Sequence, residues 1–286
     1  MDSKYWDLLI IEKDRTFVDI AYSGCGSGCK YCYVPSASEK QVLASHEDLI
    51  KIVDYLNNSD LKDGHIISFC PNTEPFKSIE STGRVLFLLQ RLQENRYYVQ
   101  ISTKEYIDDA LMQELDALAK KNSIFINVSM PILSSQEMEP GTANIEQRIS
   151  NIERIRLYPY LRCGLYIKPC FRNAVDNIER YATIISRAKP DYVCIGPAFD
   201  KNTLTPCATL HHSEDAALLI PAQKSIFLDF SEKLSLSAKC PIVYSSICAI
   251  FQTKQHKCSL GLWRYDENIC CSCNMFQDRN SLSIDA

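Results

Sequence analysis

Hydrophobic segments alternate with amphipathic segments along most of the chain. Short apolar runs rich in β-branched and aromatic residues end at glycine, proline or polar residues, which is typical of β-strands. The predicted strands are 16–23, 65–70, 97–103, 124–130, 163–169 and 192–198. Between them, apolar residues recur at helical spacing. The predicted helices are 46–57, 79–95, 108–121, 144–157 and 174–188.

This alternation predicts an α/β fold. Strands that alternate with helices form a parallel sheet joined by right-handed crossovers. Six such units make either an open doubly wound sheet or a partial (β/α)6 barrel of the TIM type, and in both the chemistry gathers at the carboxyl ends of the strands. After residue 200 the pattern breaks, with a helix expected in 214–236. We therefore expect a core domain over 1–205 and a cysteine-rich extension over 206–286.

The composition is that of an ordinary globular protein, with 286 residues, 46% hydrophobic and 23% charged. No apolar run reaches transmembrane length, and Asp2 with the charges that follow it argues against a signal peptide. We expect a cytoplasmic protein without a membrane partner. The net charge of −4 gives no general attraction to nucleic-acid phosphates, so nucleic-acid binding cannot be argued from charge.

Cysteine is unusually frequent, with 14 residues. Three of them, Cys25, Cys29 and Cys32, form a C-x3-C-x2-C motif in a glycine-rich loop after the first predicted strand. Thiolates are the natural ligands of iron–sulfur clusters, and three of them on a four-iron cube leave one iron open to a small molecule. A zinc knuckle or incidental cysteines are the alternatives, but zinc normally takes other ligand sets and spacings. The motif therefore predicts a [4Fe-4S] cluster.

The motif, with Tyr31 before its last cysteine, resembles that of the radical S-adenosylmethionine (SAM) superfamily, whose partial barrel also matches the six units. Three further stretches resemble the branch of spore photoproduct lyase and DNA repair photolyase-like proteins: "NTEPFKSIE" (72–80), "ISTK" (101–104) and "EPGTANIEQR" (139–148). The resemblance implies that SAM binds the open iron. An electron from the cluster then cleaves SAM to a 5′-deoxyadenosyl radical, which abstracts hydrogen from a substrate. The electron would come from a reductant such as flavodoxin or ferredoxin.

The resemblance also implies which residues bind SAM. Lys104 and Ser102 would contact its ribose or carboxylate, and Glu74 or Glu80 its ammonium group. The expected cofactor-binding set is Tyr31, Glu74, Ser102, Lys104, Ser129 and Lys168. The alternatives are a solvated lysine for Lys104 and helix N-terminal acids for Glu74 and Glu80, where the helix dipole favours a negative charge.

A hydrogen-atom relay is a further implication of the resemblance. Cys70 ends the second predicted strand, and Tyr31 and Tyr33 flank Cys32. Thiol and phenol groups can both give up a hydrogen atom, so Cys70, Tyr31 and Tyr33 are the expected catalytic residues. A small buried hydrophobic side chain is the alternative for Cys70. For Arg148 we expect a bracing role.

The tail holds a second group of cysteines. Cys270 and Cys273 form a C-x2-C pair, with Cys258 upstream, and Cys248 or Cys240 can complete four thiolates. The possible second site is Cys248, Cys258, Cys270 and Cys273. Zinc, a second iron–sulfur cluster and no metal all remain open.

The resemblance thus implies a radical SAM enzyme, lyase-like, for which a nucleic-acid base or nucleotide is the first candidate substrate. The alternative is a radical SAM enzyme that modifies a peptide or small metabolite with the help of an auxiliary cluster in the tail. A non-catalytic iron–sulfur sensor or scaffold is a remote third interpretation.

Overall fold

An eight-stranded sheet forms the centre of the molecule. In the computed structural model, which describes residues 8–12, 15–32, 34, 37–133, 136–196, 224–238 and 240–254, the strand order is β1-β2-β5-β6-β7-β8-β9-β10. The strands are β1 (Leu9–Ile11), β2 (Arg15–Val18), β5 (His65–Phe69), β6 (Tyr97–Thr103), β7 (Ser123–Ser129), β8 (Leu161–Ile167), β9 (Tyr192–Ile195) and β10 (Ile242–Val243). Every neighbouring pair from β2 to β10 is parallel, and β1 is antiparallel to β2.

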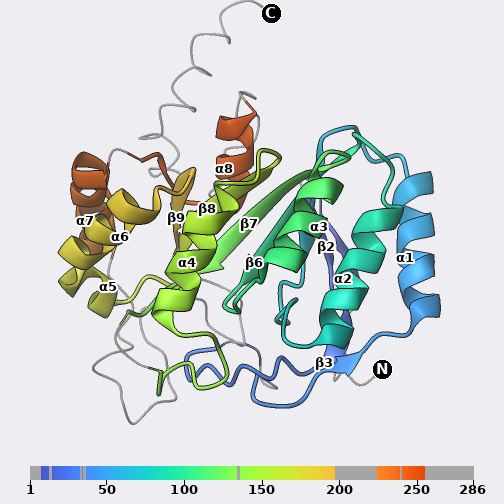
Figure 1. Ribbon diagram of the computed structural model, residues 1–286, viewed down its shortest axis with the longest axis horizontal. Coiled ribbons are helices and arrows are strands. Elements are labelled where there is room, and N and C mark those ends of the chain that lie inside the picture. Colours follow the sequence, from blue (N-terminus) through green and yellow to red (C-terminus); the bar gives the residue numbers. More distant parts are fainter. Residues whose placement is uncertain are drawn as a thin grey trace, which may run out of the picture.

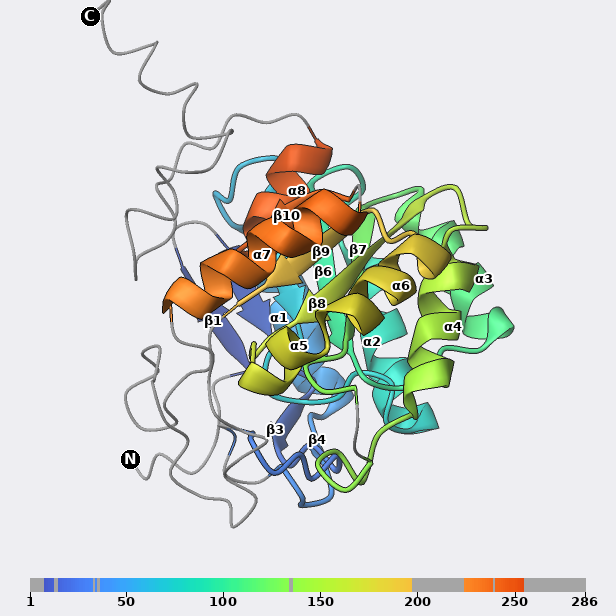
Figure 2. The ribbon, with the colours of Figure 1, turned by 90° about the vertical axis from the view of Figure 1, so that its left-hand side faces the viewer.

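Most of the helices cover one face of this sheet, and the last one packs on the opposite face (Figures 1 and 2). The helices are α1 (His46–Asn58), α2 (Ile79–Arg91), α3 (Asp109–Ala119), α4 (Ile145–Ile155), α5 (Arg172–Asp176), α6 (Ile178–Ala188), α7 (Lys224–Ala238) and α8 (Ser246–Thr253). The predicted α/β class is confirmed. The sheet is mostly parallel and not closed, as in a partial TIM-type barrel. No helix in the described ranges is long and apolar enough to cross a membrane.

The first predicted strand, 16–23, is wrong as one continuous element. β2 ends at Val18, and β3 (Ala21–Ser23) pairs with β4 (Val42–Leu43) in a separate two-stranded sheet. The break falls at Asp19, whose buried carboxylate accepts hydrogen bonds from the N–H groups of Ile20 and Asn72. These bonds turn the chain out of the main sheet and lead it toward the cysteine loop.

Two predicted helices also differ from those observed. The helix predicted over 79–95 ends at Arg91, because Leu92 takes an extended backbone conformation. The helix predicted over 174–188 is two helices, α5 and α6, which meet at Asn177. The predicted domain boundary at residue 205 lies outside the described residues and stays a prediction. Within the extension, β10 adds a parallel strand to the core sheet beside β9.

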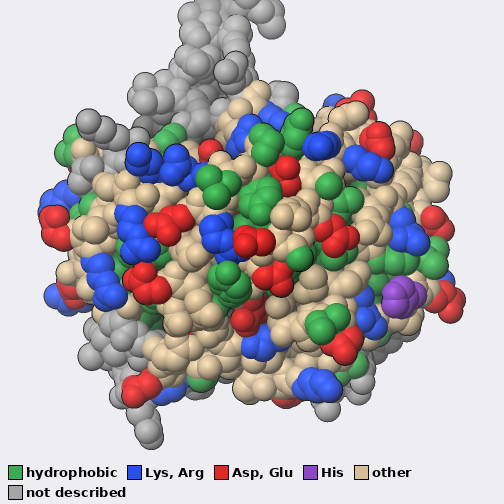
Figure 3. Space-filling model, in the orientation of Figure 1, with side chains coloured by type: hydrophobic (Ala, Val, Ile, Leu, Met, Phe, Trp, Pro, Cys, Tyr) green, Lys and Arg blue, Asp and Glu red, His purple; other side chains and the backbone are tan. Residues whose placement is uncertain are grey.

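The two faces of the sheet pack differently. Side chains such as Val99, Ile101 and Ile126 enter the core under the helices. The opposite face carries Ile66 and Phe125 in a smaller apolar cluster with residues of α8. Figure 3 shows positive and negative side chains interspersed over the helix-covered face, which therefore offers no continuous basic surface.

Candidate functional site

The predicted cluster cysteines lie in the loop between β3 and β4, at the carboxyl ends of the parallel strands (Figure 1). This loop packs against a second loop over 138–142. The Lys30 N–H donates to the carbonyl of Met138 at 3.0 Å, and the Gly141 N–H donates to that of Ser27 at 3.0 Å. A Cβ atom at Gly141 would lie 2.6 Å from the Gly26 carbonyl oxygen. Only glycine therefore allows the two loops to pack this closely.

The three thiols of this loop are free and share one electrostatic environment. Cys29 is buried, and Cys25 and Cys32 are partly exposed. Burial raises the pKa of all three, that of Cys29 to about 11, while the Lys104 ammonium lowers each of them. A metal ligand must be a thiolate, so the neighbouring cation favours the ligating form.

The donor set of this loop is three free thiols, the ligand type that iron–sulfur clusters take. Among the described residues, no group of three or more His, Cys, Asp or Glu side chains converges as a ligand set for one metal ion. A four-iron cube takes its thiolates at separate corners, so its ligands need not meet at one point. The tight glycine-rich loop and its free thiols therefore fit a [4Fe-4S] cluster.

Glu139 is the centre of a buried charged network beside the loop. Its carboxylate accepts a hydrogen bond from the Tyr31 hydroxyl and lies 3.8 Å from the Lys104 ammonium. Its other oxygen accepts from Arg148 at 2.6 Å, and both side chains of this pair are almost wholly buried. Lys104 is thus held inside the site. Burial alone would lower its pKa, but Cys29, Glu139 and Cys32 raise it above the ordinary value, so it stays charged.

Arg148 has the bracing role that the sequence predicts. Its guanidinium also donates to the carbonyls of Ala143 and Ser129, at 2.8 and 3.0 Å, and to the Thr142 hydroxyl. These bonds tie the 138–142 loop to the end of β7. Ser129, an expected SAM-binding residue, is buried at this point.

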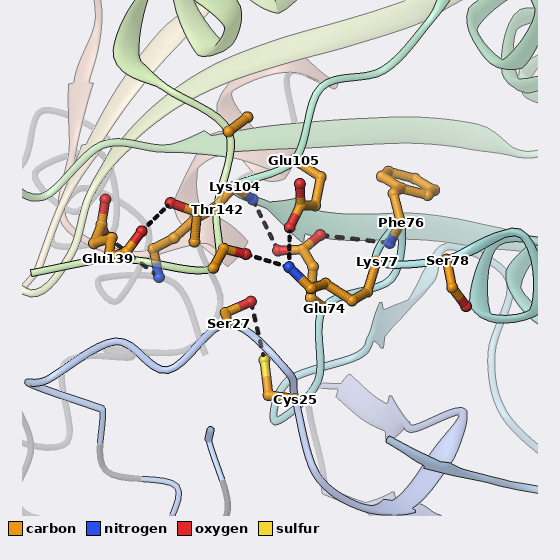
Figure 4. A network of polar contacts seen from close by, with 12 residues as sticks. Cys25, Ser27, Glu74, Phe76, Lys77, Ser78, Lys104, Glu105, Glu139 and Thr142 are labelled. Carbon is orange, nitrogen blue, oxygen red and sulfur yellow. Dashed lines mark hydrogen bonds and ion pairs between the residues drawn. The ribbon is translucent and has the colours of Figure 1, made fainter. Parts of the chain in front are cut away.

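Glu74 lies on the turn after β5 and is buried. Its carboxylate accepts hydrogen bonds from the Thr103 hydroxyl, from the Lys104 N–H at 2.9 Å and from the Phe76 N–H at 3.4 Å. Figure 4 shows the contacts of Glu74 with Lys104 and Phe76, above Cys25. Burial raises the pKa of Glu74 to about 7, against the opposing effect of the bonds from Thr103 and Lys104. Glu80 is exposed in the first turn of α2, away from this network.

We expect Glu74 to make stability depend on pH. Its folded-state pKa of about 7 lies above the ordinary value of 4.5. Its contribution is therefore fully present below pH 4.5 and is lost as the pH rises through about 7. This loss corresponds to roughly 3 kcal/mol. The free energy of unfolding in urea should be measured at pH 5 and pH 8, with all variants in the same metal-free state. Glu74→Gln should remove the decrease in this free energy between the two pH values. Glu80→Gln is the control and should keep it; equal pH dependence in wild type and Glu74→Gln would contradict the assignment.

Cys70 is buried directly after β5 and has a left-handed backbone, with φ of 55°. Its N–H donates to the Val18 carbonyl at 2.8 Å. Burial raises the pKa of its thiol well above the ordinary value, and the charges of Asp19, Glu74 and Cys25 add to this. The structure thus places Cys70 beside the cysteine loop, among the residues predicted for the site.

Ser102 and Lys168 lie on the sheet face opposite the main helix layer, the face on which α8 packs. The Ser102 hydroxyl accepts a hydrogen bond from the Asn127 amide at 3.4 Å. Lys168 follows β8, and burial lowers its pKa to about 8, with Arg15 lowering it further against the opposite effect of Cys194. Gly196 leaves room for its stem, because a Cβ there would lie 2.7 Å from the Lys168 Cδ atom.

Several predicted residues lie outside the described part of the chain. They are Tyr33, Cys258, Cys270 and Cys273. Of the remaining tail cysteines, Cys240 donates to the Pro190 carbonyl at 3.3 Å, and Cys248 packs against the apolar cluster under α8. A second metal site stays a prediction.

Sequence reasoning missed two contributors to the site. Asp19 is buried among the residues around Cys70, and an acid within the apolar run "FVDIAY" was the available signal. Lys77 donates to the Glu105 carboxylate at 2.9 Å and to the Gly141 carbonyl (Figure 4). It thereby links the turn after β5 to the 138–142 loop, and no local sequence signal marks this role.

Comparisons with known proteins agree with this architecture. A family model described as the Radical SAM superfamily matches residues 20–163. A spore photoproduct lyase variant with bound AdoMet and dinucleoside spore photoproduct superposes with a TM-score of 0.56 at 12% identity, covering 80% of this chain and 76% of that chain. Native anSMEcpe with bound AdoMet gives a TM-score of 0.54 at 14% identity, covering 80% and 62%. At these sequence identities, the two structures show a similarity of fold alone. No curated protein sequence matches this chain.

Proposed function

The chain belongs to the radical SAM superfamily, since the family model spans half of its residues, and from this premise we propose how the enzyme works. Enzymes of this family use SAM and a [4Fe-4S] cluster and need a reductant. We assign the cluster to Cys25, Cys29 and Cys32, the SAM contacts to the residues around Lys104 and Glu74, and hydrogen donation to Cys70.

One observation carries this proposal. The cysteine loop, Lys104, Glu74 and Cys70 come from four separate segments and meet at the carboxyl edge of one parallel sheet. That edge is where parallel α/β folds hold their ligands. The convergence gathers metal ligands, one cation and one titratable acid in a single place.

The protein's own residues have separate tasks there. When bound, the cluster supplies the electron that cleaves SAM and starts radical chemistry. Lys104 favours the thiolate form of the loop cysteines and offers a positive charge to the SAM carboxylate. Glu74 keeps acceptor capacity beyond its present hydrogen bonds, because an ionised carboxylate has about four acceptor positions. Ionised above pH 7, it would accept the SAM ammonium.

The tyrosine next to the last cysteine is held by its hydroxyl. Tyr31 donates to Glu139, and its ring lies 5.4 Å from the Lys104 ammonium and packs edge-on against Phe171. This arrangement supports a role in shaping the SAM pocket. A hydrogen-atom relay through Tyr31 would break the O–H bond that Tyr31 now directs to Glu139, and the proton and the electron would leave together toward the thiyl radical. For Tyr33, the proposed role in the relay rests on the resemblance alone.

For the substrate we propose a nucleic-acid base or nucleotide. The support is the resemblance of the motifs and the bound dinucleoside in the lyase neighbour. A peptide is the second candidate, since a structure of anSMEcpe with a bound peptide superposes nearly as well, with a TM-score of 0.53. The reductant would be a flavodoxin or ferredoxin.

An anaerobic assay tests the proposal. Cluster-loaded protein, SAM and dithionite should release 5′-deoxyadenosine, and a substrate of the right class should accelerate that release. A dinucleotide and a cysteine-containing peptide, supplied separately, distinguish the two candidates. Cys70→Ala should change the product or its turnover while SAM is still cleaved. Absence of 5′-deoxyadenosine from fully loaded protein would refute the proposed activity.

A further inference from the structure

We infer that Tyr192 and Asn127 are positioning residues that hold the Ser102 hydroxyl as a hydrogen-bond donor toward bound SAM. The inference rests on the proposed function, in which the residues around Lys104 contact SAM. Ser102 lies two residues before Lys104 on the same strand, so the two side chains leave on the same face. Tyr192 and Asn127 are not among the residues that the sequence predicts for the site, and both are almost wholly buried.

One row of the sheet brings these residues together. The parallel register aligns Ser102 of β6 with Asn127 of β7. It also aligns Asn127 with Gly164 of β8, and Gly164 with Tyr192 of β9. Residues at matching positions in neighbouring strands point to the same face of a sheet. Here that face is the one opposite the main helix layer, where Tyr192 joins the apolar cluster under α8.

Gly164 lets the Tyr192 side chain cross strand β8. A Cβ atom at Gly164 would lie 2.1 Å from the Cε2 atom of Tyr192, so the ring occupies the space that any other residue would fill. The Tyr192 hydroxyl thereby reaches the Asn127 side chain, two strands away, at 2.7 Å. The row thus holds a phenol on β9 against an amide on β7, with a glycine between them.

The hydrogen bonds along this row have one direction. Tyr192 donates to Oδ1 of Asn127 at 2.7 Å, and Nδ2 of Asn127 donates to the Ser102 hydroxyl oxygen at 3.4 Å. Burial raises the pKa of the Tyr192 phenol well above its ordinary value, so the phenol keeps the proton that it donates. An amide has its oxygen on one side and its NH2 group on the other. The bond from Tyr192 therefore decides which of the two faces Ser102.

The Ser102 hydroxyl keeps its own proton for a ligand. A hydroxyl can donate once and accept twice, and Asn127 takes up one of the acceptor positions. Among the residues that the structure describes, no acceptor is bonded to the Ser102 proton. Ser102 is partly exposed, whereas Asn127 behind it is fully buried. The proton is therefore available to an acceptor oxygen of SAM, in its ribose or its carboxylate.

Removal of the Tyr192 hydroxyl should reverse this arrangement. Oδ1 of Asn127 would then be buried without a donor, which is costly for a polar atom. The amide would turn so that Oδ1 accepts the proton of Ser102. The Ser102 hydroxyl would then donate inward and no longer to SAM, although neither Ser102 nor its surroundings had been changed.

The affinity for SAM, measured in a double-mutant cycle, tests the inference. The dissociation constant is determined by anaerobic equilibrium dialysis of cluster-loaded protein without reductant, so that SAM is bound but not cleaved. Tyr192→Phe keeps the ring over Gly164 and should weaken SAM binding roughly 5–10-fold, the effect of one lost hydrogen bond. Ser102→Ala should weaken it to a similar extent. In the Ser102→Ala background, Tyr192→Phe should change the affinity by less than about two-fold, because the group through which it acts is absent.

Tyr97→Phe is the matched control. Tyr97 is as buried as Tyr192, and its hydroxyl also donates inside the protein, to the Leu56 carbonyl. Tyr97 belongs to the core under the helices, on the other face of the sheet. Its substitution removes a buried phenol hydroxyl without touching the row, so the SAM affinity should stay at the wild-type value.

Two results would overturn the inference: an unchanged SAM affinity in Tyr192→Phe or in Ser102→Ala, or an equal loss on Tyr192→Phe in both backgrounds. The second result would mean that the phenol acts through general packing and not through Ser102. Wild-type protein that carries its cluster but binds no SAM would refute the proposed function, and this inference with it. Normal wild-type binding with either of the first two results would refute the role of Tyr192 and Asn127 alone.

Discussion

Cys29→Ala is expected to abolish cluster loading and SAM cleavage together. Cys29 is the most buried of the three loop thiols and lies beside Lys104. Loss of its thiolate leaves two protein ligands for a four-iron cube, which cannot hold the cluster against loss to solvent. Iron and acid-labile sulfide per chain should fall to background after anaerobic reconstitution. Release of 5′-deoxyadenosine should fall to the level without protein.

Cys163→Ala is the matched control for this experiment. Cys163, on β8, is also buried, but it belongs to the apolar core under the helices. We expect normal iron and sulfide contents from it, with a modest loss of stability from the small cavity. Retained SAM cleavage in Cys29→Ala, or equal iron loss in both variants, would contradict the assignment of the cluster to this loop.

Glu139→Gln is expected to destabilise the protein by about 3–5 kcal/mol. The substitution keeps the shape of the side chain but leaves the buried Arg148 and the partly buried Lys104 without their counter-charge. A buried ion that loses its partner keeps its desolvation cost, which is why this loss exceeds that of an exposed pair. For a chain of this size the apparent Tm should fall by roughly 10 °C. Thermal unfolding followed by circular dichroism measures it.

Glu153→Gln provides the comparison. Glu153 pairs with Arg187 at 2.7 Å on the surface, where both side chains are partly exposed. Solvent screens such a pair, so its loss should change stability by less than about 1 kcal/mol. If the two variants melt at the same temperature, the network around Glu139 is not a main source of stability.

Much of the fold could be predicted because its signals are local. The apolar runs at 97–103 and 124–130 coincide with β6 and β7 to within one residue. N-cap residues such as Ser45, Asp108 and Asn144 mark where helices begin, since each side chain accepts a hydrogen bond from the first turn. The break at Asp19 depends in part on a bond from Asn72, 53 residues away, and no local pattern reveals that partner.

In the candidate site, too, some residues could be assigned from the sequence and others only from the structure. The three cysteines could be assigned from the sequence because all of them lie in one short loop, whose spacing is a property of the chain itself. The partner of Arg148 could not, because Glu139 and Glu146 are both close in sequence. The structure pairs Arg148 with Glu139 and places Glu146 on the surface beside Arg187.

The sequence by itself determined the alternation of strands and helices, the cysteine motif and the family to which the chain belongs. Each of these depends on residues that are close together along the chain. Only the tertiary structure decided which charges face which thiols. It brought Lys104 to the loop cysteines, and Asp19 and Glu74 to Cys70. These relations depend on how four distant segments meet at one sheet edge, and electrostatic effects act through distance in space rather than along the chain.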